Sequence, residues 1–404
     1  MPRKKKEEDT PFDEFTKSIQ KLPLSYQRRI VAPLEKIVRQ DEAKQAHEYL
    51  ESISNGPRLV THIDEDGLVS AIMMVAANPK KYAEIVYTDY RPLNAGSFTF
   101  LLTDDVVDLP QPRNPILDEK GEPVKNKDGV VFEEVVTNFW ADHHETGKRG
   151  EYAGEHLYDP KSRSCSSLLY KHFMKKEPSF KRFKELVEGT DIVDSASYRT
   201  AEAPYDMGNP GVLLRLFLTN AKGQKGTSPG FREKLIREAA DEDNDWKEAV
   251  YSPVVKAIAQ DALAQFEIYR QYIKPFITSE HGVTIKMEEK VRARGLGIKD
   301  RYYAHTAYPE NMFVLDVWSN IGGRTYSIAM SENMLHKDKE GNHPSKLILG
   351  EELGAIVEKV IGDTNAGGHK GIGVCTTIPA SKKDEVVKAC KELLYEETKR
   401  LGAY

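Results

Sequence analysis

Cysteine is scarce in this chain of 404 residues. The three cysteines, Cys165, Cys375 and Cys390, lie far apart and form no CxxC pair. Such spacing fits neither a disulfide framework nor a zinc site built from thiolates. A protein without paired cysteines suits a reducing compartment, so we expect this one to be cytoplasmic.

Long apolar runs and a surplus of basic residues are also lacking. No stretch of about 18 consecutive apolar residues occurs, and the basic run at residues 3–6 is followed at once by acids. We therefore expect no secretory signal and no membrane partner. Lysine and arginine total 58 against 63 acids, a formal net charge of -5, which argues against a protein that coats long DNA.

The chain does contain a regular succession of strand-like and helix-like segments. Short apolar runs that predict strands lie at residues 58–63, 84–87, 97–103 and 135–140. Helical patterns lie between them at residues 68–77, and then from Ser164 or Ser166, either of which suits an N-cap, to about residue 176. This alternation predicts parallel βαβ units, in which functional residues gather at the carboxyl ends of the strands. Residues 110–135, rich in Pro, Gly, Lys and Asp, interrupt it as an inserted hairpin or loop.

The second half of the chain has a different pattern. A linker-like stretch at residues 222–230 precedes a charged helical region at 231–276. Further predicted strands and helices lie at residues 282–287, 312–318, 325–330, 351–360, 371–378 and from 381 onward. We therefore predict an α/β protein with four parts. They are a tail with a helical lead-in (1–55), a parallel-sheet domain with flanking helices (56–222), a helical linker (223–280) and a smaller α/β domain (281–404).

Acids and histidines stand just beyond a predicted strand in four places. They are His62-Ile-Asp64-Glu-Asp66, Thr103-Asp104-Asp105, Asp142-His143-His144 and Asp191-Ile-Val-Asp194. A single aspartate after a strand commonly caps the next helix. Four such places in succession would converge at one edge of a parallel sheet, and about five carboxylates gathered there cannot all stay ionised without compensating cations.

Divalent metal ions are the natural compensation for such a cluster. Carboxylate and imidazole together suit Mn²⁺ or a related ion better than Mg²⁺, which prefers oxygen ligands and retained water. Ligands for two ions about 3.5–4 Å apart form the usual apparatus for hydrolysing phosphate esters. The residue types alone therefore predict metal-dependent phosphoester hydrolysis.

The same motifs resemble those of a known family. His62-x-Asp64-x-Asp66, the Asp104 region, Asp142-His143-His144 and Asp194 are similar to the motifs of the DHH phosphoesterases, which include RecJ-type exonucleases, nanoRNases, cyclic dinucleotide phosphodiesterases and family II pyrophosphatases. Asn365-Ala-Gly-Gly-His369 resembles the Gly-Gly-His motif of the DHH-associated C-terminal domain. The motifs span about residues 58 to 378. The resemblance implies a catalytic DHH domain followed by a substrate-binding domain.

The resemblance also implies a role for each motif residue. One Mn²⁺ would be held by His62, Asp64 and Asp104, and a second by Asp66, Asp104, His143 and Asp194, with Asp104 bridging and Mg²⁺ or Co²⁺ as possible substitutes. His144 would face the substrate, and Asp142 would orient a histidine ring. Asp105 is an alternative to Asp104, and Asp191 an alternative to Asp194.

The glycine motif and one arginine are candidates for binding substrate phosphate. Gly367 and Gly368 permit backbone conformations that expose N–H groups to a phosphate, and His369 and Lys370 can add donors. An ordinary helix end followed by a turn is the alternative interpretation of these glycines. The resemblance also makes Arg324 a candidate for the same pocket, since arginine suits phosphate binding.

The leading hypothesis is a Mn²⁺-dependent phosphodiesterase that cleaves short oligonucleotides or dinucleotides, with a metal-bridged hydroxide attacking phosphorus. Two alternatives stay open. One is a phosphatase for small compounds such as a phosphonucleotide, polyphosphate or pyrophosphate, and the other is a nucleotide-binding or scaffold protein without catalysis. A homodimer is the default expectation for the oligomeric state.

Overall fold

The computed structural model describes residues 56–403 except 127–128, 146, 221–228, 289–297, 321–323, 338–343, 363–365 and 370. The predicted helical lead-in at residues 24–54 lies outside the described residues. By packing, the described residues form two compact units. The first unit extends to Pro178 and includes Ile236–Asn244, and the second contains residues 179–235 and those from 245 onward.

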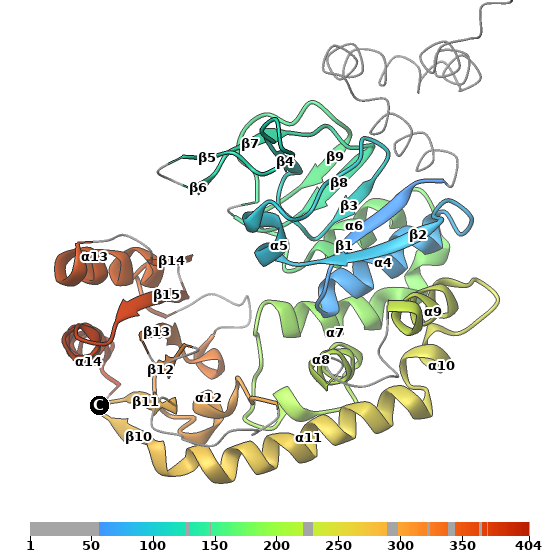
Figure 1. Cartoon of the computed structure of the whole chain (residues 1–404). Helices are drawn as coiled ribbons and strands as arrows, with labels where there is room; N and C mark the ends of the chain where they lie inside the picture. Colours follow the sequence, from blue (N-terminus) through green and yellow to red (C-terminus); the bar gives the residue numbers. More distant parts are fainter. Residues whose placement is uncertain are drawn as a thin grey trace, which may run out of the picture. The chain divides into compact units, whose positions relative to one another are not determined.

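The first unit is built on a five-stranded sheet in which every neighbouring pair of strands is parallel (Figure 1). In spatial order the strands are β2 (Glu84–Thr88), β1 (Arg58–His62), β3 (Asp105–Val107), β8 (Phe139–Asp142) and β9 (His156–Tyr158). The predicted parallel α/β architecture is confirmed. All five carboxyl ends lie at one edge, as parallel pairing requires.

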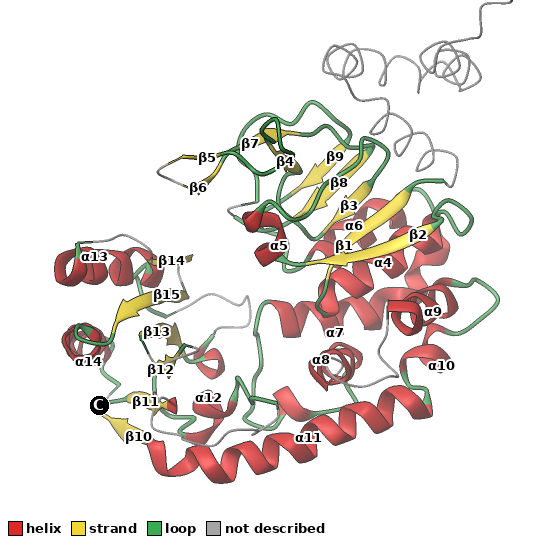
Figure 2. Cartoon of the chain, viewed as in Figure 1, coloured by secondary structure: helices red, strands yellow, loops and turns green. Residues whose placement is uncertain are grey.

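Helices and loops cover both faces of this sheet (Figure 2). On one face, α4 (Glu65–Ala77) and α6 (Cys165–Met174) pack against each other and against β1 and β8. Ser164 is the N-cap of α6, which decides between the two serines considered above. The opposite face, which carries Val60, Val106 and the fully buried Trp140, is covered mainly by loop residues and Leu93 of α5 (Tyr90–Ala95).

The predicted insertion forms two small antiparallel sheets of two strands each. Strand β4 (Arg113–Pro115) pairs with β7 (Phe132–Glu134), and β5 (Lys125–Asn126) pairs with β6 (Gly129–Val130). Gly96, the C-cap of α5, has φ +67° and lies against the insertion, since a Cβ there would be 3.1 Å from both Pro115 and Val130. The insertion therefore packs against the end of α5.

The predicted strand at residues 97–103 is wrong. The strand in this part of the chain is β3, which begins only at Asp105. The backbone of Phe100 forms its hydrogen bonds with the side chain of Asn114 instead of a strand. The Phe100 N–H donates to Asn114 Oδ1 at 2.8 Å, and Asn114 Nδ2 donates to the Phe100 carbonyl at 2.9 Å. The alternation of Phe98, Phe100 and Leu102 therefore reflects loop residues packed on the core rather than a strand in the ladder.

The second unit begins with helices. They are α7 (Lys184–Asp194), α8 (Pro210–Asn220), α10 (Trp246–Val250) and α11 (Pro253–Ile273). α8 packs against α7 and α11. The helix α9 (Pro229–Ala240) crosses the division between the units in the sequence. The predicted helical region at 231–276 is therefore confirmed as several helices in succession.

A six-stranded mixed sheet completes the second unit. Its order is β10 (Ile277–Glu280), β11 (Val283–Met287), β12 (Phe313–Ser319), β13 (Thr325–Glu332), β15 (Ile372–Pro379) and β14 (Ala366–His369). The apolar core of this unit lies between the sheet and the helices α13 (Leu349–Ile361) and α14 (Lys383–Arg400). The predicted smaller α/β part is confirmed.

The predicted domain limits after residues 55, 222 and 280 stay predictions. The two compact units are defined by packing and do not test those limits. Among the residues that the structure describes, no helix combines the length and the apolar character needed to cross a membrane.

Candidate metal centre

The turn from β1 into α4 places three potential ligands. Asp64 is the N-cap of α4, and its Oδ1 accepts the N–H of Gly67 at 3.0 Å while its Oδ2 lies 2.6 Å from His62 Nδ1. Asp66, in the first turn of α4, is fully buried. Its two oxygens accept the N–H groups of Cys165 and Ser166 at 2.7 and 3.0 Å, at the start of α6. Backbone donors at two helix N-termini thus fix both aspartates.

A buried aspartate that follows β3 lies at the centre of the arrangement. Asp108 is 1% exposed and has a left-handed backbone conformation with φ +55°, which is uncommon for a residue other than glycine. Its N–H continues the sheet by donating to the Ala141 carbonyl at 2.9 Å. One carboxylate oxygen lies 3.7 Å from His62 Nδ1 and the other lies 3.7 Å from His143 Nε2.

The Asp142-His143-His144 motif begins at the last residue of β8. Asp142 is fully buried, and its Oδ1 accepts the N–H of His143 at 2.9 Å and the Nδ1 proton of His144 at 2.7 Å. His143 Nδ1 lies 3.2 Å from the Ser162 carbonyl, a contact that leaves Nε2 facing Asp66 and Asp108, each at 3.7 Å. Asp142 therefore orients His144, and Ser162 sets which nitrogen His143 presents.

These side chains form two groups that share Asp108. In His62, Asp64 and Asp108, and again in Asp108, His143 and His144, one potential ligand atom from each residue lies within 4.8 Å of the others. Carboxylates and imidazoles at such separations fit a first-row divalent ion such as Mn²⁺. The carboxyl edge of the sheet is therefore a candidate metal centre.

The electrostatics of the cluster favour positive charge. Burial alone would lower the pKa of His62 and of His144, but hydrogen bonds to Asp64 and Asp142, together with the surrounding negative charges, raise both pKa values above the ordinary value. Burial would likewise raise the pKa of Asp64, yet the neighbouring His62 and the Gly67 N–H hold that pKa far below its usual range. The carboxylates thus attract cations to this edge.

Asp104, predicted as the bridging ligand, does not lie in the cluster. It precedes β3 at the opposite, amino edge of the sheet. There its carboxylate accepts two hydrogen bonds from the Arg58 guanidinium, at 2.7 and 2.9 Å. Its alternative, Asp105, accepts Tyr82 at 2.5 Å and Asn138 at 2.6 Å and pairs with Lys81. Because the strand begins at Asp105 rather than ending before Asp104, both side chains belong to the structural contacts of the amino edge.

The sequence motifs did not predict Asp108 as a site residue. The signal available was the pair of β-branched residues Val106 and Val107 directly before an aspartate, a short buried strand followed by an acid. Tyr90, also missed, follows β2 and lies edge-to-face against both His62 and His144, with ring centroids 5.4 and 5.8 Å apart.

The remaining predicted site residues belong to the second unit. Asp194 is the last residue of α7, so the expectation that the Asp191–Asp194 motif follows a strand is wrong. The motif is helical throughout, and both aspartates are half-buried. As ligands, both residues remain a prediction.

The glycine motif is a strand rather than the predicted loop or helix end. Gly367, Gly368 and His369 lie in β14, the edge strand of the sheet, opposite Val374, Gly373 and Ile372 of β15. Lys370 lies outside the described residues. Arg324 is exposed, directly before β13.

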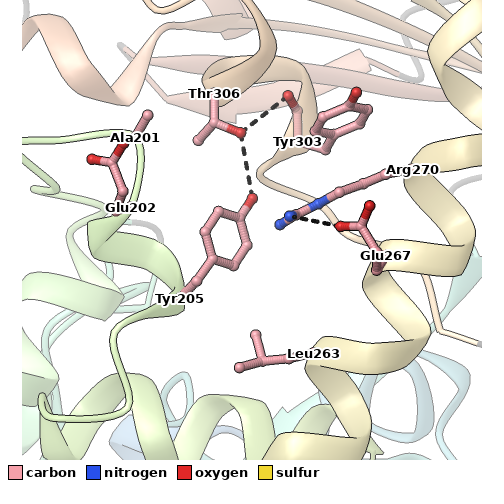
Figure 3. A pocket seen from close by; sticks show the side chains of 8 residues that line it. All are labelled: Ala201, Glu202, Tyr205, Leu263, Glu267, Arg270, Tyr303 and Thr306. Atoms are coloured by element: carbon pink, nitrogen blue, oxygen red, sulfur yellow. Dashed lines mark hydrogen bonds and ion pairs between the residues drawn. The ribbon is translucent and has the colours of Figure 1, made fainter.

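A surface cavity of about 500 Å³ elsewhere in the second unit has a different character (Figure 3). Arg270 lies in its wall, with the guanidinium carbon 4.2 Å from the Tyr205 ring centroid. The charge of Arg270 is already neutralised by the buried Asp300, whose carboxylate accepts hydrogen bonds from the guanidinium at 2.7 and 2.8 Å. The same carboxylate accepts a hydrogen bond from the Tyr205 hydroxyl at 3.0 Å. We interpret these contacts as structural.

Comparison with known proteins gives the class of fold. No family model and no curated relative matches the chain. The solved structure of PggH, a pGpG-specific phosphodiesterase from Vibrio cholerae, is 17% identical, and the match covers 84% of this chain and 99% of PggH with a TM-score of 0.61. Identity this low shows the fold alone. The chain has the fold of that phosphodiesterase.

Two further solved structures match over most of this chain. The DHH domain of a member of the s1p family of ribosomal proteins is 13% identical, covering 96% of this chain and 93% of that chain with a TM-score of 0.46. RecJ from Thermus thermophilus, in complex with Mn²⁺, is 13% identical, covering 86% of this chain and 54% of RecJ, also with a TM-score of 0.46. The predicted fold, a parallel-sheet domain with a smaller C-terminal α/β part, is confirmed by the two sheets described above and by the match to PggH.

Proposed function

We propose that this protein is a Mn²⁺-dependent phosphodiesterase that hydrolyses short oligonucleotides or dinucleotides with two metal ions. The observation that carries the proposal is the gathering of buried carboxylates and imidazoles around Asp108 at the carboxyl edge of a parallel sheet. Parallel α/β sheets place their active sites at this edge. The donor set fits Mn²⁺, with Mg²⁺ or Co²⁺ as substitutes.

The proposed ligands divide between two ions. His62, Asp64 and Asp108 would hold one ion, and Asp66, His143 and Asp108 the other, so that Asp108 replaces Asp104 as the bridge. Asp194 is proposed as a further ligand of the second ion because of its place in the motif order. Two bound divalent ions acidify a water molecule and stabilise the charge that develops on phosphoryl oxygens.

His144 is proposed to act on the substrate, with Asp142 orienting its ring. Asp142 Oδ1 accepts the Nδ1–H of His144, with 2.7 Å between the nitrogen and the oxygen, and raises the pKa of the ring against the opposing effect of burial. The Nε2–H of His144 can donate to a phosphoryl oxygen or to the leaving oxygen.

Substrate phosphate is proposed to bind the second unit. β14 carries Gly367 and Gly368 and is an edge strand among the described residues, so backbone N–H groups on its outer side have no partner strand there. Together with His369, Lys370 and Arg324 it would hold a terminal phosphate. The likeness to PggH, whose substrate is the linear dinucleotide pGpG, supports a substrate of this size.

The central test is the substitution Asp108→Asn in the full chain. We expect Mn²⁺-stimulated cleavage of a generic aryl phosphodiester to fall by at least about 10³-fold, because removing a residue from a catalytic unit costs most of its rate enhancement. Glu119→Gln is the matched control, since it makes the same change in charge in an exposed turn of the insertion. Unchanged cleavage by Asp108→Asn would refute the assigned site.

A panel of substrates distinguishes the proposed activity from its alternatives. Linear dinucleotides, longer RNA, longer DNA, cyclic dinucleotides, 3′-phosphoadenosine 5′-phosphate and pyrophosphate would be compared at equal concentration. We expect the highest kcat/KM for linear dinucleotides. Cleavage of pyrophosphate alone would refute the diesterase, and cleavage of none would favour a binding protein.

A further inference from the structure

Tyr90 lies between the two histidines to which the proposed function gives different tasks. Its ring contacts His62 at an interplanar angle of 69° and His144 at 82°, both edge-to-face. Such contacts fix the relative orientation of aromatic rings, because the edge of one ring is attracted to the face of the other. A single side chain therefore restrains two imidazoles that lie at the carboxyl ends of different strands, β1 and β8.

The backbone that carries Tyr90 is itself restrained at both ends of α5. At the start, Asp89 is the N-cap, and its Oδ1 accepts the Arg91 N–H at 2.7 Å. At the end, Gly96 adopts φ +67° and lies against Pro115 and Val130 of the insertion. The insertion at residues 110–135 therefore braces the short helix from which Tyr90 projects.

In the part of the chain that the structure describes, each imidazole is held by a hydrogen bond at Nδ1. His62 Nδ1 contacts Asp64, and His144 Nδ1 donates to Asp142. A ring held through one nitrogen can still swing about that bond, and Tyr90 contacts both rings outside these hydrogen bonds. Groups that orient a metal-binding histidine affect metal affinity and activity although they touch neither metal nor substrate.

We propose that Tyr90 is a positioning residue, whose aromatic ring sets the orientation of His62 for metal binding and of His144 for contact with the substrate. The inference rests on the proposed function. It assigns the insertion a task as well, which is to hold α5 and so keep Tyr90 in place.

The test compares Tyr90→Ala and Tyr90→Phe in the full chain, with Tyr170→Ala as the matched control. Tyr170 is half-buried on α6 and supplies the same loss of a ring on another helix. Mn²⁺ affinity is measured by calorimetry, and kcat and KM are measured on a linear dinucleotide. We expect Tyr90→Ala to weaken Mn²⁺ affinity and lower kcat about 10–100-fold. Tyr90→Phe and Tyr170→Ala should bind and cleave like the wild type.

Two results would overturn the inference. One is a Tyr90→Ala variant with the metal affinity and kcat of the wild type, and the other is a Tyr90→Phe variant as damaged as Tyr90→Ala, which would assign the effect to the hydroxyl. Failure of the proposed function gives a different result, since the wild-type chain itself would then neither bind Mn²⁺ nor cleave the dinucleotide.

Discussion

Two aspartates only four positions apart, Asp104 and Asp108, have opposite surroundings. Asp104 pairs with Arg58 at the amino edge of the sheet, and Asp108 lies among three imidazoles at the carboxyl edge. At a rise of about 3.3 Å per residue, the intervening strand separates the two positions by roughly 13 Å. The start of β3 therefore decides which aspartate belongs to the proposed metal centre.

This difference predicts the effect of Asp104→Asn. The substitution removes the buried charge that faces Arg58, so we expect the free energy of unfolding to fall by about 1–3 kcal/mol. Mn²⁺ affinity should stay at the wild-type value, because Asp104 lies at the far edge. Urea unfolding and calorimetry of the same preparation measure the two quantities. Loss of Mn²⁺ affinity with unchanged stability would restore Asp104 as a ligand.

At the scale of elements, the turn between β1 and α4 depends on Gly67. A Cβ at this position would lie 2.3 Å from the His62 carbonyl oxygen, which no side chain tolerates. The same residue donates its N–H to Asp64 and accepts the Thr61 hydroxyl at 2.6 Å. The close approach therefore allows one tight turn to place His62, Asp64 and Asp66 together.

We predict that Gly67→Ala damages both the fold and the site. Because backbone must move to admit the methyl group, the free energy of unfolding should fall by about 1–3 kcal/mol and Mn²⁺ affinity should fall with it. Gly150→Ala is the matched control, since a Cβ there meets no atom within 4 Å. Thermal unfolding with and without Mn²⁺ measures both effects. A Gly67→Ala variant as stable as Gly150→Ala would contradict this account of the turn.

Hydrophobic periodicity and turn residues predicted most elements but not the start of one short strand. The central residues of Arg58–His62 are buried, and the apolar composition of such a run is enough to predict a strand. Residues 97–103 carry the same alternation, yet a side chain, Asn114, satisfies the Phe100 backbone in place of a neighbouring strand. That contact joins residues 14 positions apart, so no local pattern reveals it.

The site, too, was predictable only where its residues form local motifs. The motifs around Asp64 and His143 are local, because each ligand stands a fixed number of residues beyond a strand. Asp108 was missed with the strand that precedes it, and Tyr90 was missed because its contacts with His62 and His144 join three separate strand ends.

At the scale of the whole molecule, the proposed metal centre changes what the negative net charge implies about the substrate. The formal net charge is -5, and four of the acids, Asp64, Asp66, Asp108 and Asp142, lie at the carboxyl edge of the first sheet. Two divalent ions would bring about four positive charges to that edge. An acidic chain is therefore compatible with a short phosphate substrate, which bound metal would attract.

The most direct test of the central claim is the stoichiometry of Mn²⁺ binding to the full chain, measured by calorimetry for the wild type and for Asp108→Asn. Because Asp108 faces His62 on one side and His143 on the other, we predict two bound ions in the wild type and weakened binding of both in the variant. Two ions bound equally well by Asp108→Asn, or no Mn²⁺ bound by the wild type, would contradict the account.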